Sequence, residues 1–205
     1  MDLRGNRSVS RQLLVTGAVV VSLLGGVSAC GGDDDKSDPK PTATESTTAA
    51  PTPEPQPPGA DGVTYEILNW AKFADDPAVL AWKTTNEAIG ASLNQGKVLP
   101  AARAGTSKRV LRAYLPSLQE SWKQEWHVRK TGKARVKSAR TSSTSSRLVM
   151  CVWTPSIGFY DKNNKYVGKP ENFWRKQNAK LKLSGDRWVV TSFEYDGKCP
   201  GGKPA

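Results

Sequence analysis

Apolar side chains recur at helical spacing from residue 77 onward, directly after a pair of acids. Asp76 is a good N-cap, and Pro77 suits the first turn of a helix. The apolar positions are Val79, Trp82, Ile89 and Leu93. This pattern predicts a helix over 77–94, and Gly96 is a plausible stop.

A second helical pattern follows over about 106–126. Its apolar positions are Leu111, Leu115, Leu118 and Trp122. These residues fall on one helical face, so the segment predicts an amphipathic helix. Pro116 lies inside it and should kink or divide the helix, because proline lacks a backbone N–H.

Beyond Gly132 the hydrophobic period changes from helical to twofold. Alternation or dense apolar character predicts strands at about 133–137, 147–154, 179–183 and 188–195. Polar residues 161–164 predict a hairpin turn between Tyr160 and Tyr166. The order, helices first and then strands, predicts an α+β fold with helices packed on one face of a curved antiparallel sheet.

The amino terminus has the pattern of an export signal. Three arginines precede Leu13–Ala29, an uncharged and largely apolar run. A transmembrane helix is the first alternative, but the run is short for a span and contains three glycines. A secreted protein without lipid is the second, because Val27, Ser28 and Ala29 would also serve as a cleavage site.

Cys30 distinguishes between these readings. The order Val27-Ser28-Ala29-Cys30 at the end of an apolar run resembles the bacterial lipobox. This resemblance implies that the Cys30 thiol is joined to diacylglycerol and that residues 1–29 are removed as a signal peptide. The expected location is the extracytoplasmic face of the cell membrane, where the partner of the lipid anchor is the bilayer.

Residues 30–62 predict a disordered tether that begins at the lipidated cysteine. The segment is rich in proline, threonine and aspartate, and it lacks aromatic and large aliphatic side chains. Such a composition cannot form a core and favours extended polyproline conformations. Its threonines and serines also permit O-glycosylation, which composition leaves open. One folded domain, 63–205, remains.

Charge is divided unevenly along the chain. The total is +11, with +2 in residues 1–29 and −5 in residues 30–62, so the domain carries 11 − 2 + 5 = +14. Such a basic domain favours an anionic partner, and outside the cell this means phospholipid head groups or wall polymers rather than nucleic acid. The candidate binding residues, which alternate along two predicted strands, are Lys133, Arg135, Lys137, Lys180 and Lys182. A merely solvated strand face is the alternative.

Cys151 and Cys199 are the thiols that remain once Cys30 is lipidated. Disulfides persist in exported domains, so an intramolecular bond between these two is expected. Free buried cysteines or a bond between two molecules are the alternatives.

The sequence assigns no catalytic residue, metal site or cofactor. His127 is the only histidine, so no histidine-based metal cluster can form, and a catalytic triad would depend on this one side chain. Neither a glycine-rich phosphate loop nor a CxxC pair is present. We therefore expect no cofactor.

The order of elements, together with two short motifs, resembles the nuclear transport factor 2-like family found in many actinobacterial lipoproteins. The motifs are a cysteine-bearing strand that ends in Thr154-Pro155-Ser156 and a closing Gly185-Asp186-Arg187-Trp188-Val189-Val190. This resemblance spans 63–199. It implies a sheet wrapped round the helices as a cone with a pocket.

The resemblance implies two classes of function. Many relatives are non-catalytic binding or scaffolding modules, and the shortage of acids and bases favours this class. The alternative is a pocket enzyme of the isomerase, hydratase or cyclase type, which uses an Asp or His with a Tyr. Side chains available for that role are Asp75, Glu87, Tyr65 and Tyr114, although no motif fixes any of them in it.

Overall fold

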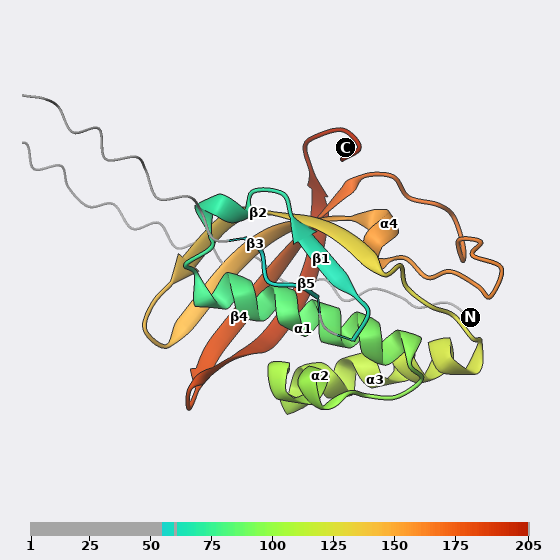
Figure 1. Cartoon of the computed structure of the whole chain (residues 1–205), viewed down its shortest axis with the longest axis horizontal. Coiled ribbons are helices and arrows are strands. Elements are labelled where there is room, and N and C mark those ends of the chain that lie inside the picture. The colour runs from blue at the N-terminus through green and yellow to red at the C-terminus, as the bar shows by residue number, and fades with distance from the viewer. Residues whose placement is uncertain (1–54, 60, 205) are drawn as a thin grey trace, which may run out of the picture. The chain divides into compact units, whose positions relative to one another are not determined.

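The computed structural model describes residues 55–59 and 61–204, which Figure 1 draws in colour. The predicted signal peptide, Cys30 and most of the predicted tether lie outside these residues. Within the described part of the chain, no helix is long and apolar enough to cross a membrane. The described residues carry a continuous core, so we expect residues 55–205 to fold on their own.

Five strands form one sheet, in which they follow each other in chain order. They are β1 (Thr64–Ile67), β2 (Thr131–Thr141), β3 (Ser145–Trp153), β4 (Trp174–Ser184) and β5 (Arg187–Cys199). Strands β2 to β5 pair antiparallel, whereas β1 pairs parallel to β2. The α+β class is confirmed, but the sheet is mixed rather than purely antiparallel. The four residues of β1 are too few for a readable period, so this strand was not predicted.

Side chains satisfy the free edge of β1. The backbone N–H of Tyr65 donates to Oε1 of Glu87 at 2.8 Å. The amide of Gln56 accepts from the N–H of Ile67 at 2.8 Å and donates to its carbonyl at 2.9 Å. These bonds cover the edge against pairing with another chain. Gln56, which the sequence places in the tether, thus contacts the domain.

The first helix, α1 (Pro77–Asn94), has the predicted bounds. The Asp76 carboxylate accepts from the N–H groups of Ala78 and Val79, as an N-cap does. After the last turn Gly96 adopts a φ of +69°, the left-handed conformation that glycine tolerates best.

The second predicted helix, over about 106–126, corresponds to α3 (Lys108–Lys123). A short helix that was not predicted, α2 (Pro100–Gly105), precedes it. Thr106 and Ser107 separate the two helices. Ser107 caps α3, because its Oγ accepts from the N–H of Val110 at 3.3 Å. Pro116 lies inside α3 without dividing it. Its position is exposed, so water can bind the Arg112 carbonyl that loses its helical donor.

The predicted hairpin at 160–166 is reduced to isolated bridges. Tyr160 pairs singly with Tyr166 and with His127, and neither tyrosine belongs to a named strand. The Asp161 carboxylate accepts from the N–H groups of Asn163 and Lys165, and these local bonds replace a ladder. A one-turn helix, α4 (Thr154–Ile157), precedes this segment, and a short 3-10 helix, η1 (Trp70–Lys72), lies between β1 and α1.

Helix α1 crosses one face of the sheet, which we call the inner face (Figure 1). The buried sheet residues that pack in this core include Val136, Leu148, Met150, Ala179 and Leu181. Trp82 of α1 is fully buried, and its Nε1 donates to Oε1 of Gln177 at 2.6 Å. The main core therefore lies between α1 and the sheet.

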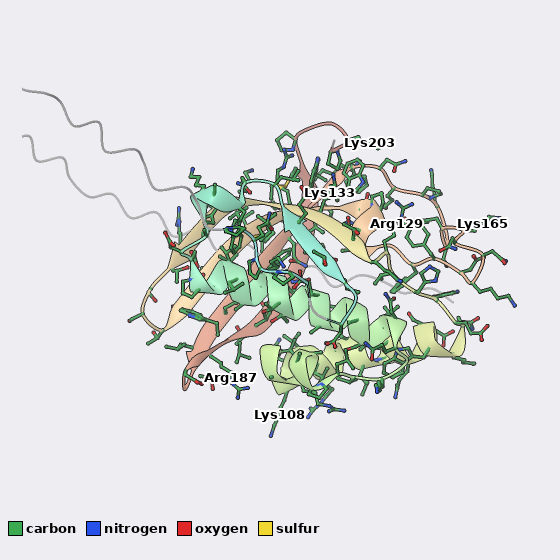
Figure 2. All side chains as sticks on the ribbon, viewed as in Figure 1. Lys108, Arg129, Lys133, Lys165, Arg187 and Lys203 are labelled. Carbon is green, nitrogen blue, oxygen red and sulfur yellow. A yellow bond between two sulfur atoms is a disulfide. The ribbon has the colours of Figure 1, made fainter. Side chains whose placement is uncertain are left out.

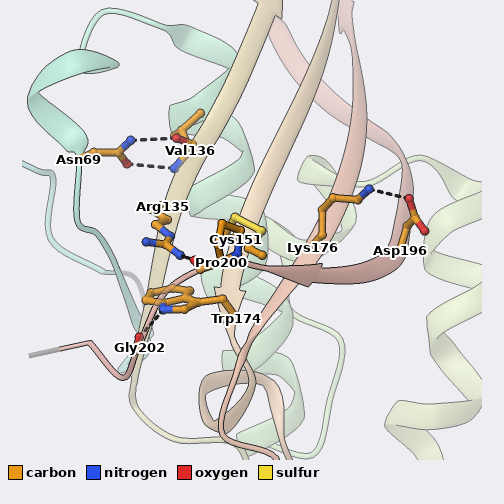
Figure 3. Close-up of a disulfide and its surroundings, with 10 residues drawn as sticks. Asn69, Arg135, Val136, Cys151, Trp174, Lys176, Asp196, Pro200 and Gly202 are labelled. Carbon is orange, nitrogen blue, oxygen red and sulfur yellow. Dashed lines mark hydrogen bonds and ion pairs between the residues drawn. A yellow bond between two sulfur atoms is a disulfide. The ribbon is translucent and has the colours of Figure 1, made fainter.

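A smaller cluster lies on the opposite, outer face. Cys151 of β3 and Cys199 at the end of β5 form a disulfide with Cα atoms 5.9 Å apart, which confirms the predicted pairing. Trp153 and Trp174 complete the cluster. Figure 3 shows the chain after Cys199 passing over Trp174, whose Nε1 donates to the carbonyl of Gly202 at 2.8 Å.

Candidate ligand cavity and basic sheet face

A cavity of about 250 Å³ lies between α1, α3 and the inner face of the sheet. Its apolar lining is Ile89, Leu93, Leu118, Val128, Ile157 and Phe159, together with Gly90. Its polar lining is Tyr65, Asn86, Tyr114, Ser117, Arg175 and Tyr195. An apolar enclosure with a few polar groups is typical of small-molecule sites, and this volume is at the small end of their range.

Arg175 is the charged residue of the cavity lining. Its Nη2 donates to the Glu171 carboxylate at 2.8 Å, and its side chain is 35% exposed. The guanidinium also lies 5.8 Å from the centre of the Tyr195 ring. A guanidinium has five N–H donors, so the contact with Glu171 leaves donors available for a second anion. Partial exposure places this cation where a ligand could reach it from solvent.

Two tyrosines of the lining remain protonated. Burial raises the pKa values of Tyr65 and Tyr114 well above the ordinary value for tyrosine. The Tyr65 hydroxyl donates to the carbonyl of Ser156 at 3.4 Å. Among the described residues the Tyr114 hydroxyl has no hydrogen-bond partner, and its ring packs edge-on against Phe193 at 5.9 Å. Tyr114 can therefore donate to a ligand, whereas neither tyrosine supplies a base.

The acids named for the enzyme alternative do not line the cavity. Asp75 is exposed ahead of α1. Glu87 is fully buried, but its Oε1 accepts from Lys83 at 2.5 Å and from the Tyr65 N–H at 2.8 Å. Burial raises the pKa of Glu87, although these two bonds oppose the shift. Of the four side chains named, only Tyr65 and Tyr114 therefore meet at the cavity.

His127 lies in a separate open cleft. Its Nε2 is 3.0 Å from Oδ1 of Asn164, and Arg129 and Lys130 also line the cleft. Arg129 stacks over the Tyr160 ring at 4.8 Å. Within the described residues there is no group of three or more His, Cys, Asp or Glu side chains that could hold a metal ion.

The sheet separates the basic residues that the sequence grouped together. Lys133 lies 3.7 Å from the Glu66 carboxylate. The guanidinium of Arg135 stacks over Trp174 at 4.6 Å and donates to the carbonyl of Pro200 (Figure 3). These two cations therefore have structural contacts. Lys137, Lys180 and Lys182 are exposed.

Two arginines that the sequence analysis did not select join Lys180 on the outer face. Arg140 of β2 is the register partner of Arg147 of β3, and Arg147 is the partner of Lys180 of β4. A register shift between Val136 and Ser138 moves Arg140 to the face of Arg135. Strict alternation from Lys133 would place Arg140 on the inner face. Its position on the outer face could therefore have been predicted only with knowledge of this bulge.

Figure 2 labels cations on several other elements, including Lys108 on α3 and Arg187 at the turn between β4 and β5. Positive charge alone therefore does not single out one surface as a binding site. What distinguishes Arg140, Arg147 and Lys180 is that they are register partners on neighbouring strands.

Comparison of the chain with protein-family models, with curated proteins and with solved structures finds no match.

Proposed function

We propose that this chain is a lipid-anchored, extracytoplasmic binding protein whose domain holds a small amphipathic ligand in the cavity under α1. Support for the anchor is the Val27-Ser28-Ala29-Cys30 order that ends the apolar run. The ligand site rests on one observation: a largely apolar cavity of about 250 Å³ has a single charged group, Arg175, in its lining. We also propose the nuclear transport factor 2-like family, because helices packed on one face of a sheet, with a cavity between them, agree with that resemblance.

The lining indicates the chemistry of the ligand. Its apolar side chains suit a hydrocarbon or aromatic body, and Arg175 suits a carboxylate. At the packing density of protein interiors, the volume accommodates roughly ten non-hydrogen atoms. The ligand class is therefore a small apolar acid.

Binding without chemistry is favoured over the enzyme alternative. An isomerase, hydratase or cyclase of the implied type would need an acid or base within reach of the ligand. The lining contains no Asp, Glu or His, and burial keeps Tyr65 and Tyr114 protonated. Glu87, the buried carboxyl of α1, is outside the lining and is bonded to Lys83.

Titration calorimetry of residues 55–205 with octanoate tests the cavity. Octanol, which has a matched chain and no charge, is the comparison ligand. In Arg175→Gln we expect octanoate to bind about tenfold more weakly and octanol to be unaffected, because only the acid uses the guanidinium. Arg187→Gln, at an exposed turn, is the matched control.

Glu171→Gln supplies a change of opposite sign. This change removes the negative charge that competes for the Arg175 guanidinium and leaves only a weaker neutral acceptor, so octanoate should bind more tightly. Failure of octanoate to bind the unmodified domain saturably, or equal octanoate affinity in Arg175→Gln, would overturn the proposed ligand class.

A further inference from the structure

Three cations on neighbouring strands lie opposite one another across the outer face. Arg140, Arg147 and Lys180, which we call the cation row, are consecutive register partners on β2, β3 and β4. Neighbouring strands are ~4.8 Å apart, so the row spans about 10 Å. All three side chains are exposed, and none has an ion-pair partner among the described residues.

The row has few acids close to it. On β5 its neighbour is Ser192, the register partner of Lys180. Glu194 lies two residues further along β5, opposite Asn178, and Asp196 is bonded to Lys176 at 2.7 Å. The flanks of the row carry further positive charge, since Lys182 follows Lys180 on the same face and Lys137 stands at the bulge of β2.

This arrangement opposes folding. Like charges placed directly opposite one another destabilise a sheet, and none of the three side chains makes a hydrogen bond within the described residues that would offset the repulsion. Solubility alone does not need such a row, because uncharged polar side chains or opposite charges would keep the face solvated equally well. An external anion is the partner that would relieve the repulsion.

We propose that the cation row binds a linear polyanion that carries phosphate on successive units. Arginine presents a planar fork that suits phosphate oxygens, and two of the three cations are arginines. A line of three charges along about 10 Å suits an extended chain whose anions follow each other closely. This surface is separate from the cavity, which lies on the other side of the sheet.

A polymer is favoured over a lipid surface by the side chains around the row. Val149, the apolar neighbour of the row on β3, is half-buried and has a small side chain. Leu183 is exposed, but it alternates with Lys182 along β4 and therefore faces the inner side of the sheet. Peripheral membrane binding usually adds an apolar or aromatic group that enters the bilayer. No such group accompanies the row among the described residues.

Two variants that each lose three positive charges test the proposal. The first is Arg140→Gln with Arg147→Gln and Lys180→Gln. The matched control is Lys108→Gln with Arg109→Gln and Arg112→Gln, which removes three exposed charges from α3. Binding of residues 55–205 to inorganic polyphosphate is measured by titration at about 50 and about 300 mM salt, because the screening of exposed charges differs strongly between these concentrations.

We expect the first variant to bind polyphosphate about tenfold more weakly and the control to change by less than about twofold, since three contacts of a few-fold each multiply. Added salt should weaken polyphosphate binding more steeply in the unmodified domain than in the first variant. Equal losses in both variants would show that net charge alone matters and would overturn the proposal, as would no loss in either.

Three further readouts sharpen the test. The first variant should unfold at a higher temperature than the unmodified domain, so weaker binding cannot reflect misfolding. Polyglutamate and vesicles of anionic phospholipid serve as comparison probes, and tighter binding to either of them than to polyphosphate would overturn the phosphate assignment. Octanoate affinity should be the same in both variants, which separates this surface from the cavity.

Discussion

Nζ of Lys83 lies 2.5 Å from Oε1 of Glu87, one turn further along α1, and neither side chain is exposed to solvent. Lys83 also donates to the carbonyl of Pro57 at 2.9 Å, and Glu87 accepts from the N–H of Tyr65. The ion pair thus joins α1 to the edge strand and to the segment before it. The second carboxylate oxygen of Glu87, Oε2, is buried and has no hydrogen-bond partner among the described residues.

Replacing Lys83 by Met should destabilise the domain in a pH-dependent way. Burial raises the pKa of Glu87 in the folded protein, so this group's contribution to stability falls as pH rises above the ordinary glutamate range. Lys83 opposes that shift, and its loss should raise the pKa further. We expect Lys83→Met to lower the free energy of unfolding by about 3–5 kcal/mol at neutral pH and by less near pH 5, where the carboxyl can stay protonated.

Urea unfolding of residues 55–205 at the two pH values measures this effect. Lys97→Met, which removes an exposed lysine just after α1, is the control and should change stability little at either pH. A loss in Lys83→Met that is the same at both pH values would contradict the assigned role of Glu87.

Asn69 extends the pairing of β1 beyond its last residue. Its side-chain amide donates to the carbonyl of Val136 at 2.8 Å and accepts from the N–H of Val136 at 2.9 Å (Figure 3). Asn69→Ala should lower the free energy of unfolding by about 1–3 kcal/mol, because both backbone groups lose their partner. Thermal or urea unfolding measures the loss, and Asn163→Ala, on an exposed turn, should be nearly neutral. If the two variants proved equally stable, the two hydrogen bonds between Asn69 and Val136 would contribute nothing measurable to the stability of the domain.

The parts of the fold that the sequence predicted are those fixed by local chemistry. The bounds of α1 follow from Asp76, Pro77 and Gly96, whose effects are confined to their own turns. The parallel strand β1 depends instead on contacts with Glu87 and Gln56, which are remote in sequence. No local period marks such a strand.

The candidate sites show the same division. Tyr65 and Tyr114 could be named from the sequence because their chemistry is intrinsic, but Arg175 enters the cavity only through the pairing of β4 within the sheet. Arg140 likewise joins the outer face through a bulge. The positions that sequence reasoning missed are those that strand register places, and register depends on the whole sheet.

The disulfide between Cys151 and Cys199 should contribute about 2–4 kcal/mol to stability, because it restricts the unfolded chain across a sequence separation of 48 residues. Replacing both cysteines by serine should lower the free energy of unfolding by that amount in urea. Reduction of the unmodified domain should have a similar effect, which provides an internal control. Alkylation of both thiols in natively exported, unreduced protein would refute the bond.

Cys30→Ser should abolish attachment of lipid to the exported chain. The expectation rests on the order Val27-Ser28-Ala29-Cys30, since only a thiol in this position can form the thioether to diacylglycerol. Metabolic labelling with a fatty-acid probe, followed by separation of membrane and soluble fractions, measures it. Replacement of Cys151 and Cys199 by serine should leave labelling of whatever chain is exported intact, because neither residue follows an apolar run with small residues before it. Equal labelling of Cys30→Ser and the unmodified chain would place the lipid elsewhere, whereas loss of label together with release from the membrane would establish Cys30 as the anchor.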